Sequence, residues 1–345
     1  MIMRKIVVLF CLLSLHPAIQ SQDIHFSQFY QAPLNQNPAL AGAERKSEAS
    51  LQYRSQWQSV ADPYTTMAAN VYTRLGKSNR ENFFGLGANF FQDQSGDSKL
   101  RTTLAALSLA YHVRIGNNHK LGLGVSAAYG QLSVDSKALE WGSQYSGNAY
   151  NPSIDPGEVL GQAAFAYPDL SSGLVWTFSN TSGKARVNRN NYRQGSFGIS
   201  VFHLNRPEYS FLGSGQLLLP KLVVHGRFLL SIPSTKLAVN PAFMFYRQGP
   251  NSETFLGGML RYDLVTESKY TGVYKNAGVY LGAFLRTGDA LVISSLFEFD
   301  QFSLGLSYDT NISALKNVSR GRGGFEISIA YIGNNSFFNR SVKTH

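Results

Sequence analysis

Polar and apolar residues alternate with a period of two along most of this chain after residue 46, and this pattern constrains the fold more than any other feature. In the stretch SEASLQYRSQW, Ala49, Leu51 and Tyr53 fall on one side of an extended chain, whereas Gln52 and Arg54 fall on the other. Many such segments exceed the five or six residues typical of soluble strands, and no later apolar run has the length of a membrane helix. The pattern therefore predicts long strands with one apolar and one polar face.

Turn-rich gaps divide this region into fourteen predicted strands, the even number that a single-chain bacterial barrel has. The predicted strands cover 47–57, 64–75, 82–92, 100–114, 120–133, 162–178, 194–204, 219–231, 235–247, 253–264, 277–286, 290–299, 301–310 and 323–332. Charged residues make up 15% of the chain, against roughly 25% in soluble domains, while it has 18 Tyr and 23 Phe. We predict an all-β, antiparallel, transmembrane outer-membrane β-barrel of about 14 strands; the alternative is a soluble β-rich secreted protein.

The N-terminus has the pattern of an export signal. Arg4 and Lys5 precede an apolar run from Ile6 to Leu15, which is too short to span a bilayer and is followed by small residues. This predicts a signal peptide over residues 1–21, with cleavage near Ser21/Gln22, then an irregular segment over 22–46 and the barrel over 47–345. Cys11 is the only cysteine and lies inside the signal, so the mature chain can form no disulfide.

The lengths of the connections predict an orientation. If the N-terminus is periplasmic, the long connections 135–162, 205–218 and 311–322 fall outside the cell, and the short turns near 76–81, 115–119 and 232–234 fall inside. Short periplasmic turns and long external loops are typical of bacterial barrels. Residues 179–193 form a long inner connection and residues 287–289 a short outer one, and both depart from this rule.

Catalytic, cofactor and metal motifs are absent from the sequence. No histidine belongs to an H-E-x-x-H pair, and there is no G-x-S-x-G elbow. Gly85–Leu86–Gly87 and Gly122–Leu123–Gly124 lack the third glycine of a dinucleotide loop and lie inside alternating strands, so we interpret them as small residues on one strand face. The net charge of +10 is spread along an exported chain, which argues against nucleic acid as a partner. We predict no enzyme activity and no cofactor.

The segment between the signal and the first strand has no helix or strand period. FSQFYQAPLNQNPALAG contains two prolines and many amides; the prolines prevent a continuous ladder, and Asn37–Pro38 suits a turn. We predict that Gln22–Gly42 packs against the inner wall or the periplasmic rim of the barrel and helps to fix the side of Arg54. The alternative is a loose spacer, since chain ends are often disordered unless tied down.

The same segment, together with YRSQW, resembles the start of the PorP/SprF family, outer-membrane proteins associated with type IX secretion and gliding motility in Bacteroidetes. Later stretches of this sequence, GISVFHLNRP (198–207), LGAFLRTGDA (281–290), LGLSYDTNIS (304–313) and GGFEISIAY (323–331), are similar to the family's later segments, so the resemblance covers nearly the whole chain. The residues assigned to the family motif are Phe26, Ser27, Gln28, Phe29, Pro33, Asn37, Pro38, Ala39, Gly42, Tyr53, Arg54, Gln56, Trp57, His203, Tyr308, Asp309 and Glu326.

The resemblance implies a role in secretion at the outer membrane. Family members bind or anchor secreted surface adhesins that carry a type IX C-terminal sorting domain, so the implied partners are such an adhesin, other type IX components and outer-membrane lipid. Two other functions stay open: an outer-membrane pore or hydrophobic-solute transporter, and a soluble β-sandwich or lectin.

Overall fold

The computed structural model describes residues 23, 25–57, 63–76, 82–96, 98–135, 139–147, 149–157, 163–180, 192–211, 215–265, 277–313 and 316–333. The predicted signal peptide, its cleavage site and the chain after residue 333 lie outside these residues. In the described part of the chain, most of the regular structure is β-strand, as the alternation predicts.

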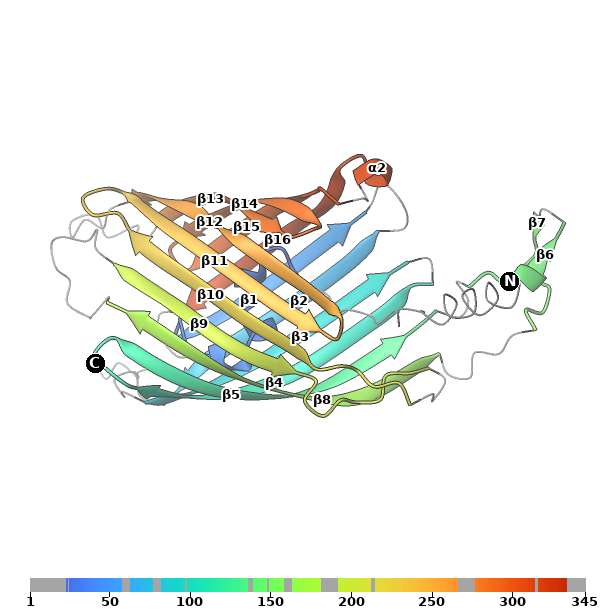
Figure 1. Ribbon diagram of the computed structural model, residues 1–345, viewed down its shortest axis with the longest axis horizontal. Coiled ribbons are helices and arrows are strands. Elements are labelled where there is room, and N and C mark those ends of the chain that lie inside the picture. The colour runs from blue at the N-terminus through green and yellow to red at the C-terminus, as the bar shows by residue number, and fades with distance from the viewer. Residues whose placement is uncertain are drawn as a thin grey trace, which may run out of the picture.

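Fourteen antiparallel strands form one closed barrel (Figure 1). The first strand pairs with β2 on one side and with the last strand, β16, on the other, so the sheet has no free edge. The strands are β1 Ser47–Gln56, β2 Tyr64–Leu75, β3 Phe83–Ser95, β4 Leu100–Arg114, β5 His119–Ser133, β8 Ala164–Ser179, β9 Arg193–Phe202, β10 Lys221–Ser231, β11 Leu237–Gln248, β12 Asn251–Val265, β13 Ala277–Arg286, β14 Ala290–Phe299, β15 Phe302–Asn311 and β16 Arg322–Gly333. All fourteen predicted strands are present, and the observed ends lie within three residues of the predicted ones.

Side chains alternate between the outer face and the lumen. In β1, Leu51 is 63% exposed on the outer face, whereas Gln52 and Arg54 are buried on the luminal face. Most of the exposed large hydrophobic side chains of the other strands lie on this outer face, where a bilayer would cover them. The polar face of each strand therefore lines the inside of the barrel.

The antiparallel order divides the connections between two mouths. One mouth, here called the long-loop mouth, carries the connections after β5, β9 and β15, and the opposite mouth carries the start of β1. The connection after β5 includes η5 Gly142–Gln144 and a small sheet of β6 Tyr145–Ser146 and β7 Ala149–Tyr150, and that after β15 includes α2 Lys316–Ser319 (Figure 1). Within the residues described, no helix is both long and apolar enough to cross a membrane.

The N-terminal residues fold inside the barrel as three single turns of 3-10 helix, η1 Phe29–Gln31, η2 Pro33–Asn35 and η3 Pro38–Leu40. Pro33 and Pro38 each begin a turn, a position where a missing backbone N–H leaves no bond unmade. Asn37 caps η3, because its Oδ1 accepts a 2.9 Å hydrogen bond from Ala39 N. Irregular but satisfied backbone of this kind suits a segment that crosses a barrel without joining its sheet.

Candidate functional site

Residues 23 and 25–46, here called the luminal segment, run through the barrel from one mouth to the other (Figure 1). At the long-loop mouth, Asp23 N donates to Oε1 of Gln248, the last residue of β11 (3.0 Å). Arg74 lies near the end of β2 at the opposite mouth, and its Nε donates to Gly42 O (2.6 Å). The predicted packing against the inner wall is confirmed, but it extends along the whole lumen rather than only at one rim. The first described residue therefore lies at the mouth that carries the long loops.

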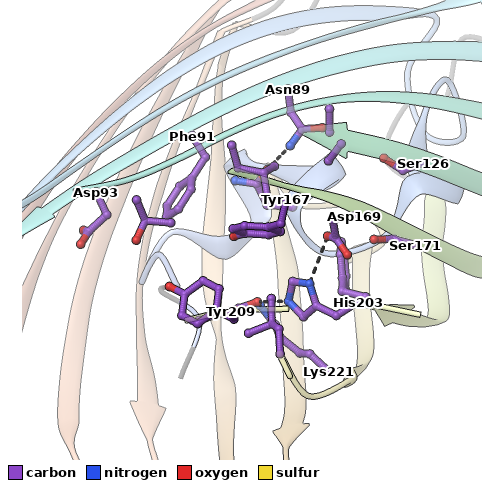
Figure 2. A pocket seen from close by; sticks show the side chains of 18 of the residues that line it. Asn89, Phe91, Asp93, Ser126, Tyr167, Asp169, Ser171, His203, Tyr209 and Lys221 are labelled. Atoms are coloured by element: carbon purple, nitrogen blue, oxygen red, sulfur yellow. Dashed lines mark hydrogen bonds and ion pairs between the residues drawn. The ribbon is translucent and has the colours of Figure 1, made fainter. Parts of the chain in front are cut away.

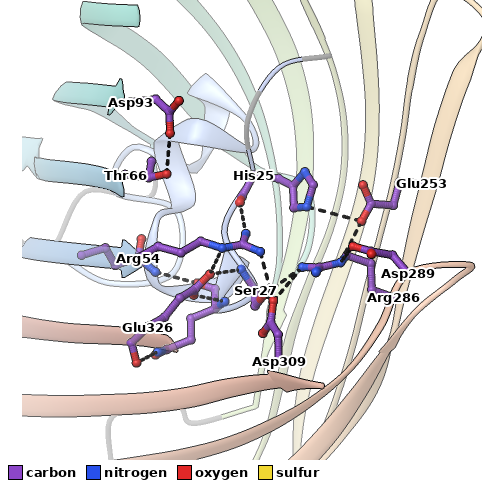
Figure 3. Close-up of polar contacts among 12 residues, drawn as sticks. His25, Ser27, Arg54, Thr66, Asp93, Glu253, Arg286, Asp289, Asp309 and Glu326 are labelled. Carbon is purple, nitrogen blue, oxygen red and sulfur yellow. Dashed lines mark hydrogen bonds and ion pairs between the residues drawn. The ribbon is translucent and has the colours of Figure 1, made fainter. Parts of the chain in front are cut away.

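A buried set of two arginines and two carboxylates, here called the charge network, lies on the wall beside this segment (Figure 3). The register places Glu326 of β16 directly opposite Arg54 of β1, and Arg54 Nε lies 3.2 Å from Glu326 Oε1. Asp309 Oδ2 of β15 lies 3.0 Å from Arg54 Nη2 and 3.0 Å from Nη1 of Arg286 at the end of β13. All four side chains are 1% exposed.

The luminal segment completes the charge network with Ser27 and Gln28. The backbone N–H groups of these two residues donate to the two oxygens of Glu326, at 2.6 and 2.8 Å. Ser27 Oγ donates to Asp309 (2.7 Å) and accepts from Arg286 (3.0 Å). Desolvating charges is unfavourable unless each is paired and hydrogen-bonded, so this network stabilises the barrel only while the segment is docked.

The middle of the luminal segment is held by one asparagine and a set of glycines. Asn37 is fully buried, and its Nδ2 donates to Leu174 O (2.9 Å) and to Ile199 O (3.3 Å) on β8 and β9. A Cβ on Gly173 would lie 2.1 Å from Asn37 Oδ1, and one on Gly124 would lie 2.3 Å from Ala39 N. The interpretation of Gly124 as a small residue on a strand face is therefore correct, and the reason is the close approach of the luminal segment.

Aromatic packing fixes the other side of the luminal segment. The ring of Phe29 lies 5.7 Å from the rings of both Phe255 and Phe284, and the ring of Tyr30 lies 5.7 Å from that of Phe284. These residues belong to a buried apolar cluster built from β10 to β14. Burial of each large side chain contributes about 1.5–3 kcal/mol, so the segment is held by packing as well as by charge.

A second polar cluster, here called the mouth latch, consists of His203, Asp169 and Lys221 (Figure 2) and holds Asp23 at the long-loop mouth. His203 Nε2 lies 2.8 Å from Asp23 Oδ2, and His203 Nδ1 lies 3.1 Å from Asp169 Oδ2. Lys221 Nζ donates to Asp23 Oδ2 at 3.1 Å. His203 directly follows β9 with a φ of 57°, a left-handed conformation in which histidine is enriched among non-glycine residues.

The mouth latch shifts the titration of both partners. Burial alone lowers the pKa of His203, but the carboxylates of Asp23 and Asp169 outweigh it and raise the pKa to about 9. Burial likewise raises the pKa of Asp23, but Lys221 and His203 outweigh it and hold that pKa below its usual range. At neutral pH, His203 is therefore a cation between two carboxylates.

Titration of His203 should follow this geometry. Because its folded pKa is raised, the latch contributes fully below about pH 6.5 and is lost as the pH rises through about 9. An NMR titration of the folded barrel in micelles should give an imidazole pKa near 9, and Asp23→Asn should lower it by about one unit or more. The control is Asp300→Asn, in an exposed turn at the opposite mouth. An imidazole pKa at the ordinary value in the wild-type barrel would contradict the latch.

The remaining residues of the predicted motif occupy separate places. Phe26, Pro33 and Gly42 are buried parts of the luminal segment, and Gly42 has a φ of 71°. Tyr53 and Tyr308 belong to the outward-facing positions of β1 and β15, and Tyr308 is 44% exposed. Gln56 ends β1, and Trp57 follows it and packs edge-on against Tyr64.

Sequence reasoning missed several residues of these clusters. Arg286, Asp169 and Lys221 were not predicted to contribute, although Arg286 stands in the stretch LRTGDA. One feature of the sequence indicates its role. Arg286 stands two residues before a turn glycine, at an inward position of a barrel strand, and an arginine there needs a luminal carboxylate. Among the residues described, no group of three or more metal-binding side chains could hold a metal ion.

Comparison with known families decides the assignment. The family described as "Type IX secretion system membrane protein PorP/SprF" matches residues 18–331, which include the luminal segment and all of the barrel strands except the last two residues of β16. The chain belongs to the PorP/SprF family. The family and this fold are those of a non-enzymatic outer-membrane barrel component associated with type IX secretion. The predicted resemblance to the PorP/SprF family is thereby confirmed.

Solved structures of other barrels are similar to this PorP/SprF chain in fold only. A TodX monoaromatic hydrocarbon channel mutant is 10% identical, with 88% of this chain and 94% of that chain covered and a TM-score of 0.47. BamA from Haemophilus ducreyi is 10% identical, with 84% and 70% covered and a TM-score of 0.43. A FadL homologue from Pseudomonas aeruginosa is 9% identical, with 86% and 92% covered and a TM-score of 0.42. These scores carry no information about function. No curated protein matches the chain.

Proposed function

We propose that this PorP/SprF barrel binds or anchors a secreted surface adhesin at its long-loop mouth, through the adhesin's type IX C-terminal sorting domain. The observation that carries the proposal is the luminal segment, which contacts opposite walls of the barrel. Gln28 is bonded to β1 and β16, Asn37 to β8 and β9, and Phe29 packs on β12 and β13. A lumen bridged in this way favours a docking platform over a diffusion pore.

The long-loop mouth offers a surface for such a partner. The hairpin of β6 and β7 and the helix α2 stand beyond the barrel rim there (Figure 1). Tyr145 and Tyr150 pair across the hairpin with ring centroids 5.5 Å apart, and both are exposed. Exposed tyrosines are typical of interface residues. The loop lengths predict that this mouth faces outward when the start of β1 is periplasmic, and Asp23 then lies at the outer mouth rather than at a periplasmic one.

Removing the gene tests the proposal. In a clean deletion of this barrel, the cognate adhesin should be lost from the cell surface, as measured with antibodies on intact cells, while total adhesin synthesis is unchanged. A complementing copy should restore surface display, and the tagged barrel should co-purify with the adhesin from outer membranes. A deletion strain with normal surface display would refute the adhesin role.

The second candidate function is a pore or hydrophobic-solute transporter. A cavity of about 300 Å³ beside the luminal segment favours it. Single-channel recordings in planar bilayers separate the two candidates, because a transporter with an open path conducts and a docking platform does not.

A further inference from the structure

The cavity beside the luminal segment lies at the long-loop mouth and has a volume of about 300 Å³. Its walls come from β3, β4, β5 and β8, and the connection after β9 closes one side. Taking about 30 Å³ for each water-sized group, the cavity holds a molecule of about ten non-hydrogen atoms. Its lining includes three tyrosines and three carboxylates; Asp23 is paired with His203 and Lys221, and the other two carboxylates are those of Asp93 and Asp169 (Figure 2).

Asp93 presents a carboxylate to this cavity without a cationic partner in the described part of the chain. It lies near the end of β3, opposite Thr66 of β2 in the sheet register. Thr66 Oγ1 donates to Asp93 Oδ1 at 2.6 Å, and Asp93 is only 5% exposed. No ion pair joins Asp93 to a described lysine, arginine or histidine, although Arg54 attracts it at longer range. A buried carboxylate in this state favours a cation brought by a ligand.

Asp169 supplies a second acceptor on the opposite side of the cavity. The residue is 2% exposed, and its Oδ2 faces His203 in the mouth latch. Its Oδ1 is buried and has no hydrogen-bond partner among the described residues. Leaving a buried acceptor unpaired is unfavourable, so a hydrogen-bond donor in the cavity would stabilise this oxygen.

Aromatic and aliphatic side chains line the space between these carboxylates. The rings of Tyr167 and Tyr209 lie 5.5 Å apart at an interplanar angle of 77°, and Figure 2 shows both between Asp93 and Asp169 in that view. Leu100 and Leu104 of β4 add apolar surface. Aromatic faces attract cations as well as apolar groups, so this lining suits a molecule with a cationic end and an apolar body.

We propose that this cavity is a binding site for a small primary amine with an aromatic or aliphatic body. The ammonium group donates to Asp93, and the body packs against the adjoining rings of Tyr167 and Tyr209. The site faces the long-loop mouth, and it does not depend on the adhesin role proposed above.

Binding of three matched probes to the folded barrel in detergent micelles tests this site. The probes are 2-phenylethylamine, the neutral 2-phenylethanol and the anionic phenylacetate, measured by isothermal titration calorimetry at pH 7. The amine should bind at least about tenfold more tightly than the alcohol, and phenylacetate should not bind, because a charge-assisted hydrogen bond is about twice as strong as a neutral one. Equal binding of the three probes, or binding of none, would overturn the proposal.

Two variants separate a specific site from general partitioning into the barrel. Asp93→Asn should lower the affinity for the amine to that for the alcohol, whereas Asp300→Asn at the opposite mouth should leave it unchanged. Tyr209 lies in the connection after β9 rather than in the barrel wall. Tyr209→Ala should weaken the binding of both the amine and the alcohol. A folded Asp93→Asn barrel, identified by its heat-dependent shift on SDS gels, that keeps wild-type affinity for the amine would also overturn the proposal.

Discussion

Deleting residues 25–44 is expected to convert a non-conducting barrel into a pore. The luminal segment bridges opposite walls through Gln28, Phe29 and Asn37, and fourteen strands enclose a wide lumen once it is removed. Planar-bilayer recordings should show no steps for the wild-type barrel and stepwise conductance on the scale of a porin for the deletion variant. The physical reason is that the walls are polar, so water and ions fill the vacated space.

A control deletion for this experiment can be made in a connection at the long-loop mouth. Removing the hairpin of β6 and β7, residues 145–150, shortens an exposed connection without touching the lumen, and it should leave the barrel silent. Both variants should keep the heat-dependent gel shift of a folded barrel. Conductance of the wild-type barrel equal to that of the deletion variant would show that the segment does not close the lumen.

Arg54→Ala is expected to be the most damaging single substitution in the luminal wall. It leaves Glu326 buried without a cation and leaves Asp309 with Arg286 alone. Breaking a buried ion pair by removing one partner is unfavourable by about 3–5 kcal/mol. We expect a loss of this size in the free energy of unfolding, measured by urea titration in micelles, together with faster amide exchange at Ser27 and Gln28, whose N–H groups bond to Glu326.

Two further substitutions make this test specific. Arg54→Lys keeps the charge but not the geometry that reaches two carboxylates, so its loss should be smaller than that of Arg54→Ala. Arg101→Ala removes an exposed arginine of β4 whose Nη2 donates to Gln94 Oε1 (2.9 Å), and it should change stability by less than about 0.5 kcal/mol. If amide exchange at Ser27 and Gln28 is unchanged in a folded Arg54→Ala barrel, the charge network does not hold the luminal segment in place.

The alternation of polar and apolar side chains predicted most of the fold. A period of two specifies strands and their faces, and the turn residues between them gave all fourteen strands to within three residues. The segment Gln22–Gly42 was predicted to help fix the side of Arg54, and in the structure Ser27 and Gln28 of this segment lie in one cluster with Arg54, Asp309 and Glu326. Residues on neighbouring strands of a closed sheet can be paired from register once the strands are known.

The path of the luminal segment was less predictable. Its turns have no period, so the sequence does not say how far it extends along the lumen or which mouth Asp23 reaches. The partnership of Asp23 with His203 and Lys221 joins positions separated by 180 and 198 residues, and the closure of the barrel, rather than any local pattern, brings them together. Arg286 was missed for the same reason, because its partners Asp309 and Ser27 come from other elements.

Disulfide cross-linking in outer membranes tests most directly the central claim that the N-terminal segment runs through the lumen. Cys11 is the only native cysteine, so introduced pairs can be read without interference. The pair Gln28→Cys with Ser328→Cys replaces two hydrogen-bonded side chains, with Ser328 Oγ 2.8 Å from Gln28 Oε1. The pair Asn35→Cys with Asn89→Cys likewise replaces two hydrogen-bonded side chains, with Asn89 Nδ2 3.0 Å from Asn35 Oδ1. Both pairs should cross-link on mild oxidation, whereas the mismatched pair Gln28→Cys with Asn89→Cys should not. Absence of cross-links in both matched pairs, or equal cross-linking in all three, would contradict the account.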